Sequence, residues 1–111
     1  MKHLKQFESF YYGTKSFVDS LLEQWNVNQE DLEDVFIWFS DMGYKVQIRQ
    51  NLTTMGKCLW IVIDNIPDLY DTELMEETRK VIRGLTKLGL YSDSPIRFEE
   101  SGIMKFAVRK I

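Results

Sequence analysis

Few residues of this 111-residue chain have the types and spacing that catalysis requires. His3 is the only histidine and stands near the start of the chain, so neither a Ser-His-Asp arrangement nor a histidine-ligated metal site is expected. Cys58 is the only cysteine, and its place at the start of a predicted strand favours a small semi-buried residue over a nucleophile. The sequence therefore predicts a protein that is not an enzyme and that uses no cofactor.

Four acidic residues before the last predicted helix are spaced superficially like the ligands of a cation-binding loop: Asp64, Asp68, Asp71 and Glu73. Pro67 interrupts this run, and the glycine and terminal glutamate of a calcium loop are missing. Carboxylates at a helix start also interact favourably with the positive end of the helix dipole. We therefore expect a solvated helix start here rather than a metal site.

A first predicted β-hairpin places a tryptophan among cationic residues. A tight turn centred on residues 54–55, followed by the permissive Gly56, fixes the register of the two strands. The predicted pairs on one face are Val46–Ile63, Ile48–Ile61 and Gln50–Leu59, and those on the other are Lys45–Asp64, Gln47–Val62 and Arg49–Trp60. Since a slip of one residue would exchange the two faces, this register decides which side chains lie together.

A second predicted hairpin turns at Glu100-Ser101-Gly102, where a three-residue loop with glycine in the left-handed position is expected. The predicted pairs are Phe98–Met104, Ile96–Phe106 and Ser94–Val108 on an apolar face, and Arg97–Lys105 and Glu99–Ile103 on a polar face. A two-residue loop would mix apolar and charged residues on both faces. The two hairpins together therefore predict one apolar face and one basic face.

The basic face has the composition of a surface for single-stranded nucleic acid. Its candidate binding residues are Lys45, Arg49, Trp60, Arg97 and Lys105. Bases can stack on an aromatic ring while lysine and arginine contact phosphates. Against this function, the chain has a formal net charge of −3, and only one aromatic residue is predicted on the face.

The N-terminal third of the chain predicts two helices. Apolar residues recur at spacings of three and four from Leu4 to Trp25, which predicts one long helix that Gly13 could divide into two. A second helix is expected from an N-cap at Asn28 to about Met42, with Gly43 ending it.

A third helix is expected to begin near Asp68 or Asp71 and to end at Gly89. The predicted fold is a single α+β domain over residues 1–111, a two-layer sandwich with the element order α-α-β-β-α-β-β. Residues 1–43 form a helical pair, and residues 44–111 form a four-stranded antiparallel sheet of two hairpins joined by one helix.

The third helix is expected to cover the apolar face of the sheet. The N-terminal helical pair is expected to cover the basic face, because the apolar side chains of Trp60 and Val62 on that face would otherwise be exposed to water. Two alternatives leave the basic face exposed, as a surface for another protein or for nucleic acid.

The favoured function is a small protein-binding module, of the adaptor or inhibitor type, that acts through the N-terminal helices. Its proposed anchors are Tyr12, Trp25, Ile37 and Trp38, because aromatic residues are enriched at interfaces. The partner is an unidentified protein or a second copy of this chain. A further alternative is an acidic inhibitor that mimics nucleic acid through Glu30, Asp31, Glu33, Asp34 and Asp41.

Composition agrees with a globular protein, since 44% of the residues are hydrophobic. No apolar stretch in the sequence is long enough for a signal peptide or a membrane span. The single cysteine fits a reducing compartment, so we expect a cytoplasmic protein that does not bind membranes.

Overall fold

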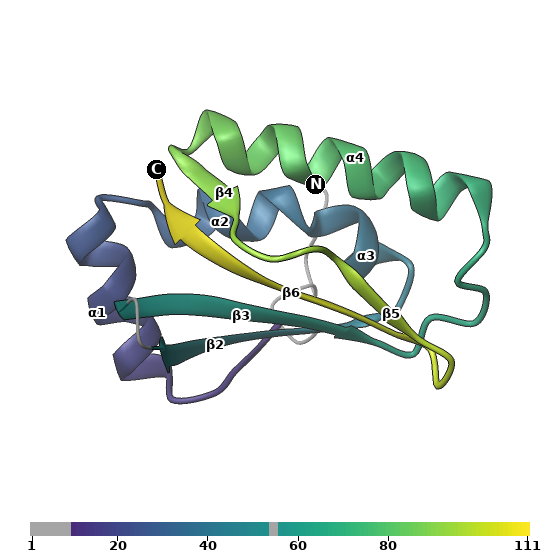
Figure 1. The fold of residues 1–111 in the computed structure, drawn as a ribbon, viewed down its shortest axis with the longest axis horizontal. Helices are drawn as coiled ribbons and strands as arrows, with labels where there is room; N and C mark the ends of the chain where they lie inside the picture. Colours follow the sequence, from purple (N-terminus) through teal and green to yellow (C-terminus); the bar gives the residue numbers. More distant parts are fainter. Residues whose placement is uncertain (1–9, 54–55) are drawn as a thin grey trace.

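The computed structural model of the protein describes residues 10–53 and 56–111. It has the mixed α+β architecture that the sequence predicts, with helices packed on a multi-stranded sheet (Figure 1). Along the chain the elements are β1 (Phe10–Tyr12), α1 (Lys15–Trp25), α2 (Gln29–Val35), α3 (Ile37–Asp41), β2 (Lys45–Thr53), β3 (Gly56–Asp64), α4 (Thr72–Lys87), β4 (Leu90–Ser92), β5 (Arg97–Glu99) and β6 (Ile103–Lys110).

The sheet has six strands and is mixed, so the prediction of four antiparallel strands is wrong. The strand order is β1-β2-β3-β6-β4, and β5 also pairs with β6. β1 runs parallel to β2, whereas all other pairs in the described sheet are antiparallel. β4 and β5 pair with the two ends of β6 and so form one interrupted edge.

The register of the first hairpin is confirmed. Ile48 lies opposite Ile61 and Arg49 opposite Trp60, as the turn chemistry predicts. Residues 54–55, where the turn was expected, lie outside the described residues. Alternation between β-branched and polar residues sends one set of side chains into the core, where Ile48 and Ile61 are fully buried.

The second hairpin is confirmed only near its turn. Arg97 lies opposite Lys105 and Phe98 opposite Met104. Farther along, Ser92 and not Ser94 lies opposite Val108, and the predicted pair of Ile96 with Phe106 is not formed.

Residues 93–96 leave the ladder for a physical reason. Pro95 has no N–H to donate to a neighbouring strand. The Ser94 hydroxyl accepts a hydrogen bond from the N–H of Ala107 at 3.1 Å, and the Asp93 N–H donates to the Ala107 carbonyl at 2.8 Å. A serine side chain therefore stands in for strand backbone at this point.

The N-terminal helix is shorter than predicted. Residues 10–12 form strand β1 instead of continuing a helix, and residues 4–9 lie outside the described part of the chain. Aromatic residues favour extended backbone when a sheet edge is at hand, and β2 provides that edge. The N–H of Gly13 adds a hydrogen bond to the Ile48 carbonyl at 3.0 Å before α1 begins.

The second predicted helix is divided at Phe36 into α2 and α3. Its predicted start is confirmed, since the Asn28 side chain accepts hydrogen bonds from the N–H groups of Glu30 and Asp31. Its predicted end is also confirmed, because Gly43 follows α3 with a left-handed φ of 85°. Phe36 is fully buried at the junction.

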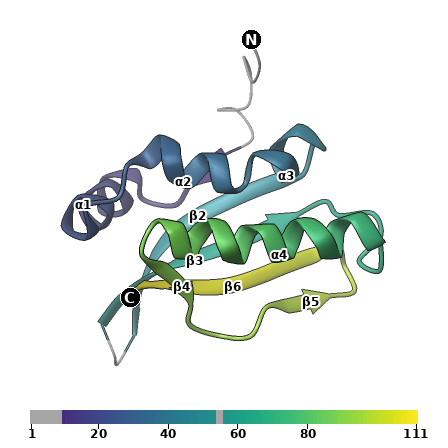
Figure 2. The same cartoon turned by 90° about the horizontal axis from the view of Figure 1, so that it is seen from above.

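All four helices of the described chain pack on one side of the sheet (Figures 1 and 2). We call this side the apolar face; its buried residues on the three long strands are Val46, Ile48, Leu59, Ile61, Ile63, Met104, Phe106 and Val108. One hydrophobic core joins these residues to Val18 of α1, Leu32 of α2, Phe39 of α3 and Leu85 of α4. The predicted cover of the basic face by the N-terminal helices is therefore wrong.

The width of the sheet explains this arrangement. Five strands abreast, at about 4.8 Å each, span about 20 Å between the outer strand axes, whereas one helix is about 10 Å across. α4 contacts the β4 edge, α1 and α3 contact β2, and α2 contacts α4 between them. Several helices are thus needed to bury one face, and those described leave the other face open.

We expect Phe106→Ala to lower the free energy of unfolding by about 3–5 kcal/mol. Phe106 is fully buried, and its ring centroid lies 6.3 Å from that of Phe36, so truncation would leave a cavity at the centre of the core. Urea unfolding followed by circular dichroism measures the change. Phe17→Ala is the matched control, because Phe17 is 59% exposed and its loss should change stability by less than about 0.5 kcal/mol. Equal effects of the two substitutions would contradict this account of the core.

Candidate functional site

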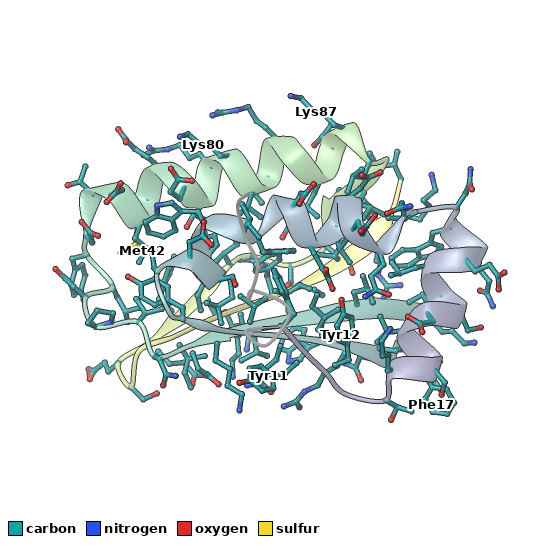
Figure 3. All side chains as sticks on the ribbon, turned by 180° about the vertical axis from the view of Figure 1, so that it is seen from behind. Tyr11, Tyr12, Phe17, Met42, Lys80 and Lys87 are labelled. Atoms are coloured by element: carbon teal, nitrogen blue, oxygen red, sulfur yellow. The ribbon has the colours of Figure 1, made fainter. Side chains whose placement is uncertain are left out.

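The side of the sheet opposite the helices is the candidate functional site. Alternation along the paired strands places on this side Tyr11, Lys45, Gln47, Arg49, Asn51, Cys58, Trp60, Val62, Asp64, Tyr91, Arg97, Glu99, Ile103, Lys105, Ala107 and Arg109. We call this set the open face. Figure 3 shows Tyr11 on this side and Lys80 and Lys87 of α4 on the opposite side of the molecule. Every predicted nucleic-acid-binding residue lies on the open face.

The open face carries three aromatic residues, not the single one that the sequence predicts. Trp60 stands near the middle and is half-buried, while Tyr11 and Tyr91 lie near opposite edges and are 47% and 40% exposed. The two tyrosines were missed because β1 was read as helix and β4 was not recognised. The alternation of Leu90, Tyr91 and Ser92 directly after a helix-ending glycine was the available signal for β4.

The charge of the open face is opposite to that of the whole chain. Among the described residues it bears five cationic side chains and two acidic ones, whereas the chain has a net charge of −3. Lys105 forms an ion pair with Glu99, and Arg109 forms one with Asp93 at 2.5 Å. The remaining three cations are Lys45, Arg49 and Arg97.

Lys45 and Arg49 are held in place by neighbours on the open face. The Nζ of Lys45 lies 4.7 Å from the ring centroid of Tyr11, a cation–π contact. The guanidinium of Arg49 donates to the Gln47 side chain at 2.6 Å, and Gln47 donates to Asp64 at 2.6 Å. Such contacts limit the side-chain entropy that either cation would lose on binding an anion.

A shallow pocket of about 420 Å³ opens at the β1 edge of the open face. It is lined by Tyr11, Tyr12, Gly13, Thr14, Gln47, Arg49 and Gln50. A side chain at position 13 would collide with Arg49, because a Cβ there would lie 2.9 Å from the arginine Cγ. Gly13 therefore lets the aliphatic part of Arg49 lie against the chain that leaves β1.

Cys58 is not an exposed nucleophile. The residue is 1% exposed, and burial raises the pKa of its thiol, which disfavours the reactive thiolate. In the described chain, no three residues of the His, Cys, Asp and Glu types gather closely enough to hold a metal ion. The acidic residues 64–73 thus form no such cluster.

The four predicted protein-binding residues lie away from the open face, and each is partly buried against the core. Tyr12 points toward the helices and donates a hydrogen bond to Glu33; burial, and then this carboxylate, raise the pKa of its phenol. Trp38 meets Phe39 edge-on with ring centroids 5.0 Å apart. Trp25, at the end of α1, and Ile37, at the start of α3, are also partly buried against the core.

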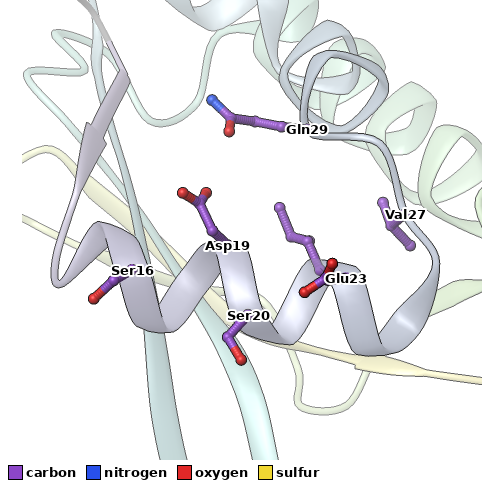
Figure 4. A pocket seen from close by; sticks show the side chains of 7 residues that line it. Ser16, Asp19, Ser20, Glu23, Val27 and Gln29 are labelled. Atoms are coloured by element: carbon purple, nitrogen blue, oxygen red, sulfur yellow. The ribbon is translucent and has the colours of Figure 1, made fainter.

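The acidic residues of the predicted nucleic-acid mimic lie on the helical layer. Glu30, Asp31, Asp34 and Asp41 are exposed, while Glu33 bonds Tyr12. A hollow of about 540 Å³ lies beside α1, and its lining includes Asp19, Glu23 and Gln29 (Figure 4). Two of these lining residues, Asp19 and Gln29, each accept a hydrogen bond from the Lys15 Nζ at 3.1 Å, so this cation partly offsets the acidic charge.

We expect the Cys58 thiol to react slowly with a disulfide reagent such as DTNB in the folded protein and rapidly after denaturation. The buried thiol is inaccessible, and its raised pKa keeps the thiolate fraction low at neutral pH, so the native rate should rise only above the ordinary thiol pKa. The absorbance of the released thiolate follows the reaction. A native rate equal to that of free cysteine would show that the sheet face does not protect this residue.

None of the described helices is long and apolar enough to cross a membrane. Comparisons with protein-family models, with curated proteins and with solved structures found no match for this chain. Its function must therefore be inferred from its own surface.

Proposed function

We propose that this protein binds single-stranded nucleic acid through the open face of its sheet. The observation that carries the proposal is the union of Tyr11, Trp60 and Tyr91 with a surplus of cations on a face that no described helix covers. Base stacking on aromatic side chains is worth about 1–3 kcal/mol per base and tolerates any sequence. Phosphates then supply the contacts to lysine and arginine.

The net negative charge of the chain is compatible with this proposal because the charges are segregated. The helices α1 to α3 contain seven acidic residues and one basic residue, and they pack on the core at the apolar face. At physiological ionic strength charges are screened over about 8 Å, which is less than the thickness of the helical layer. A phosphate at the open face therefore responds mainly to Lys45, Arg49 and Arg97.

Binding of labelled dT12 and U12, measured by fluorescence anisotropy, should weaken steeply between about 50 and 300 mM salt, because bound phosphates release counterions. Arg49→Gln should lower the affinity and reduce the slope of log K against log salt by about 0.7. Lys87→Gln is the matched control: it removes the same charge from α4 on the opposite side (Figure 3) and should leave binding unchanged. Absence of wild-type binding at low salt, or equal losses in both variants, would refute the proposal.

A second candidate function is protein binding through the helical layer. One observation favours it: Met42, which directly follows α3, is 47% exposed and lies one helical turn from the half-buried Trp38. These side chains could anchor another protein or a second copy of this chain. The edge-on contacts of Trp38 with Phe39 and Tyr44 also give it a structural role.

For this candidate, Met42→Ala should leave stability almost unchanged and abolish partner capture or self-association. Trp38→Ala should abolish the same association and, unlike Met42→Ala, should lower the free energy of unfolding by about 2 kcal/mol. This loss is smaller than that for a fully buried aromatic residue, which is about 3–5 kcal/mol. Urea unfolding measures the change in stability, and sedimentation together with pull-down measures the loss of association. An association that survives both substitutions would exclude this surface.

A further inference from the structure

We propose that a single strand crosses the open face along a diagonal from Tyr11, over Trp60, to Tyr91. This inference rests on the proposed function and adds the path of the ligand and its minimum length. It follows from the positions that the strand register gives to the three rings.

The register places the three rings on one straight diagonal. Tyr11 lies opposite Gln47, and Trp60 lies opposite Arg49, two residues farther along β2. Trp60 is also opposite Ala107, and Tyr91 is opposite Arg109, again two residues farther in the same direction along the sheet. Each step from ring to ring therefore crosses two strand spacings and advances by two residues.

The spacing of the rings sets the length of the ligand. Two strand spacings of about 4.8 Å and a two-residue advance of about 6.7 Å give a separation of about 12 Å between successive Cα atoms. Bases that stay stacked on one another are about 3.4 Å apart, so two intervals of about 12 Å would take about eight such nucleotides. A strand that is unstacked and extended between the rings needs fewer, but at least about five, since at least one nucleotide must lie between successive rings.

The surroundings of the diagonal suit such a strand. Ala107 and Cys58 flank Trp60 with small side chains, and Trp60 itself is partly exposed. In the interval between Tyr11 and Trp60, Gln47 and Arg49 line the pocket at the β1 edge and offer an amide and a guanidinium to an intervening nucleotide. The Nζ of Lys45 lies over one face of the Tyr11 ring, so a base would stack on the other face or displace the lysine, which would then be free to contact the phosphate of that base.

The test couples oligonucleotide length to substitutions at the ends of the diagonal. Fluorescence anisotropy would compare labelled dT3, which can span only one interval, with dT8, which can span both. In Tyr91→Leu the affinity for dT8 should fall by about 5- to 150-fold, the equivalent of one lost stacking contact. The affinity for dT3 should change by no more than about twofold, because the interval from Tyr11 to Trp60 stays intact.

Tyr11→Leu should give the same pattern, because it removes the ring at the other end of the diagonal. Circular dichroism shows whether each variant folds, and if one variant does not fold, the other still decides the test. Tyr70→Leu is the matched control, since Tyr70 is 90% exposed outside the open face and should affect neither oligonucleotide. Wild-type binding of dT8 that Tyr11→Leu and Tyr91→Leu leave unchanged would overturn the diagonal and spare the proposed function. No wild-type binding of dT8, or a dimer in sedimentation that excludes it, would overturn both.

Discussion

One-sided burial of a wide sheet is the constraint on which the rest of this structure depends. The apolar face is wider than a single helix, so α4 cannot cover it alone, and the N-terminal helices complete the layer. Phe36 and Phe39 from the N-terminal side and Leu85 from α4 belong to one hydrophobic core with the buried strand residues. The polarity of the opposite face follows, because residues that alternate with buried ones on the same strands must be compatible with water.

This division also separates the charges of the molecule. Cations gather where strands face away from the core, and most acids of the N-terminal half lie on the helices. A whole-chain charge is therefore a poor guide to what such a molecule attracts, because local fields act over shorter distances than its diameter. The principal-axis extents of 34, 34 and 25 Å exceed the screening length several-fold.

The sequence predicted what depends on local chemistry and missed what depends on distant neighbours. The pairing of Arg49 with Trp60 and of Arg97 with Lys105 was predicted from turn residues and alternation alone. β1 was missed because Tyr11 continues the apolar spacing of a helix, and residues 10–12 become a strand only beside the edge of β2. Without β1 and β4 the sheet looked narrow enough for one helix. The misplaced N-terminal helices and the two unrecognised tyrosines of the open face thus share one cause.

β1 has a consequence for how any ligand of its tyrosine would bind. β1 is only three residues long and pairs with one strand, β2. Detaching it therefore needs less free energy than unfolding the domain. Tyr11 is in place only while β1 is paired, and the apparent affinity of a ligand that contacts it is reduced by the fraction of molecules in which the strand is detached. By linkage, such a ligand would in turn hold β1 on the sheet. The pairing of this edge strand with β2 is therefore one step of the binding equilibrium.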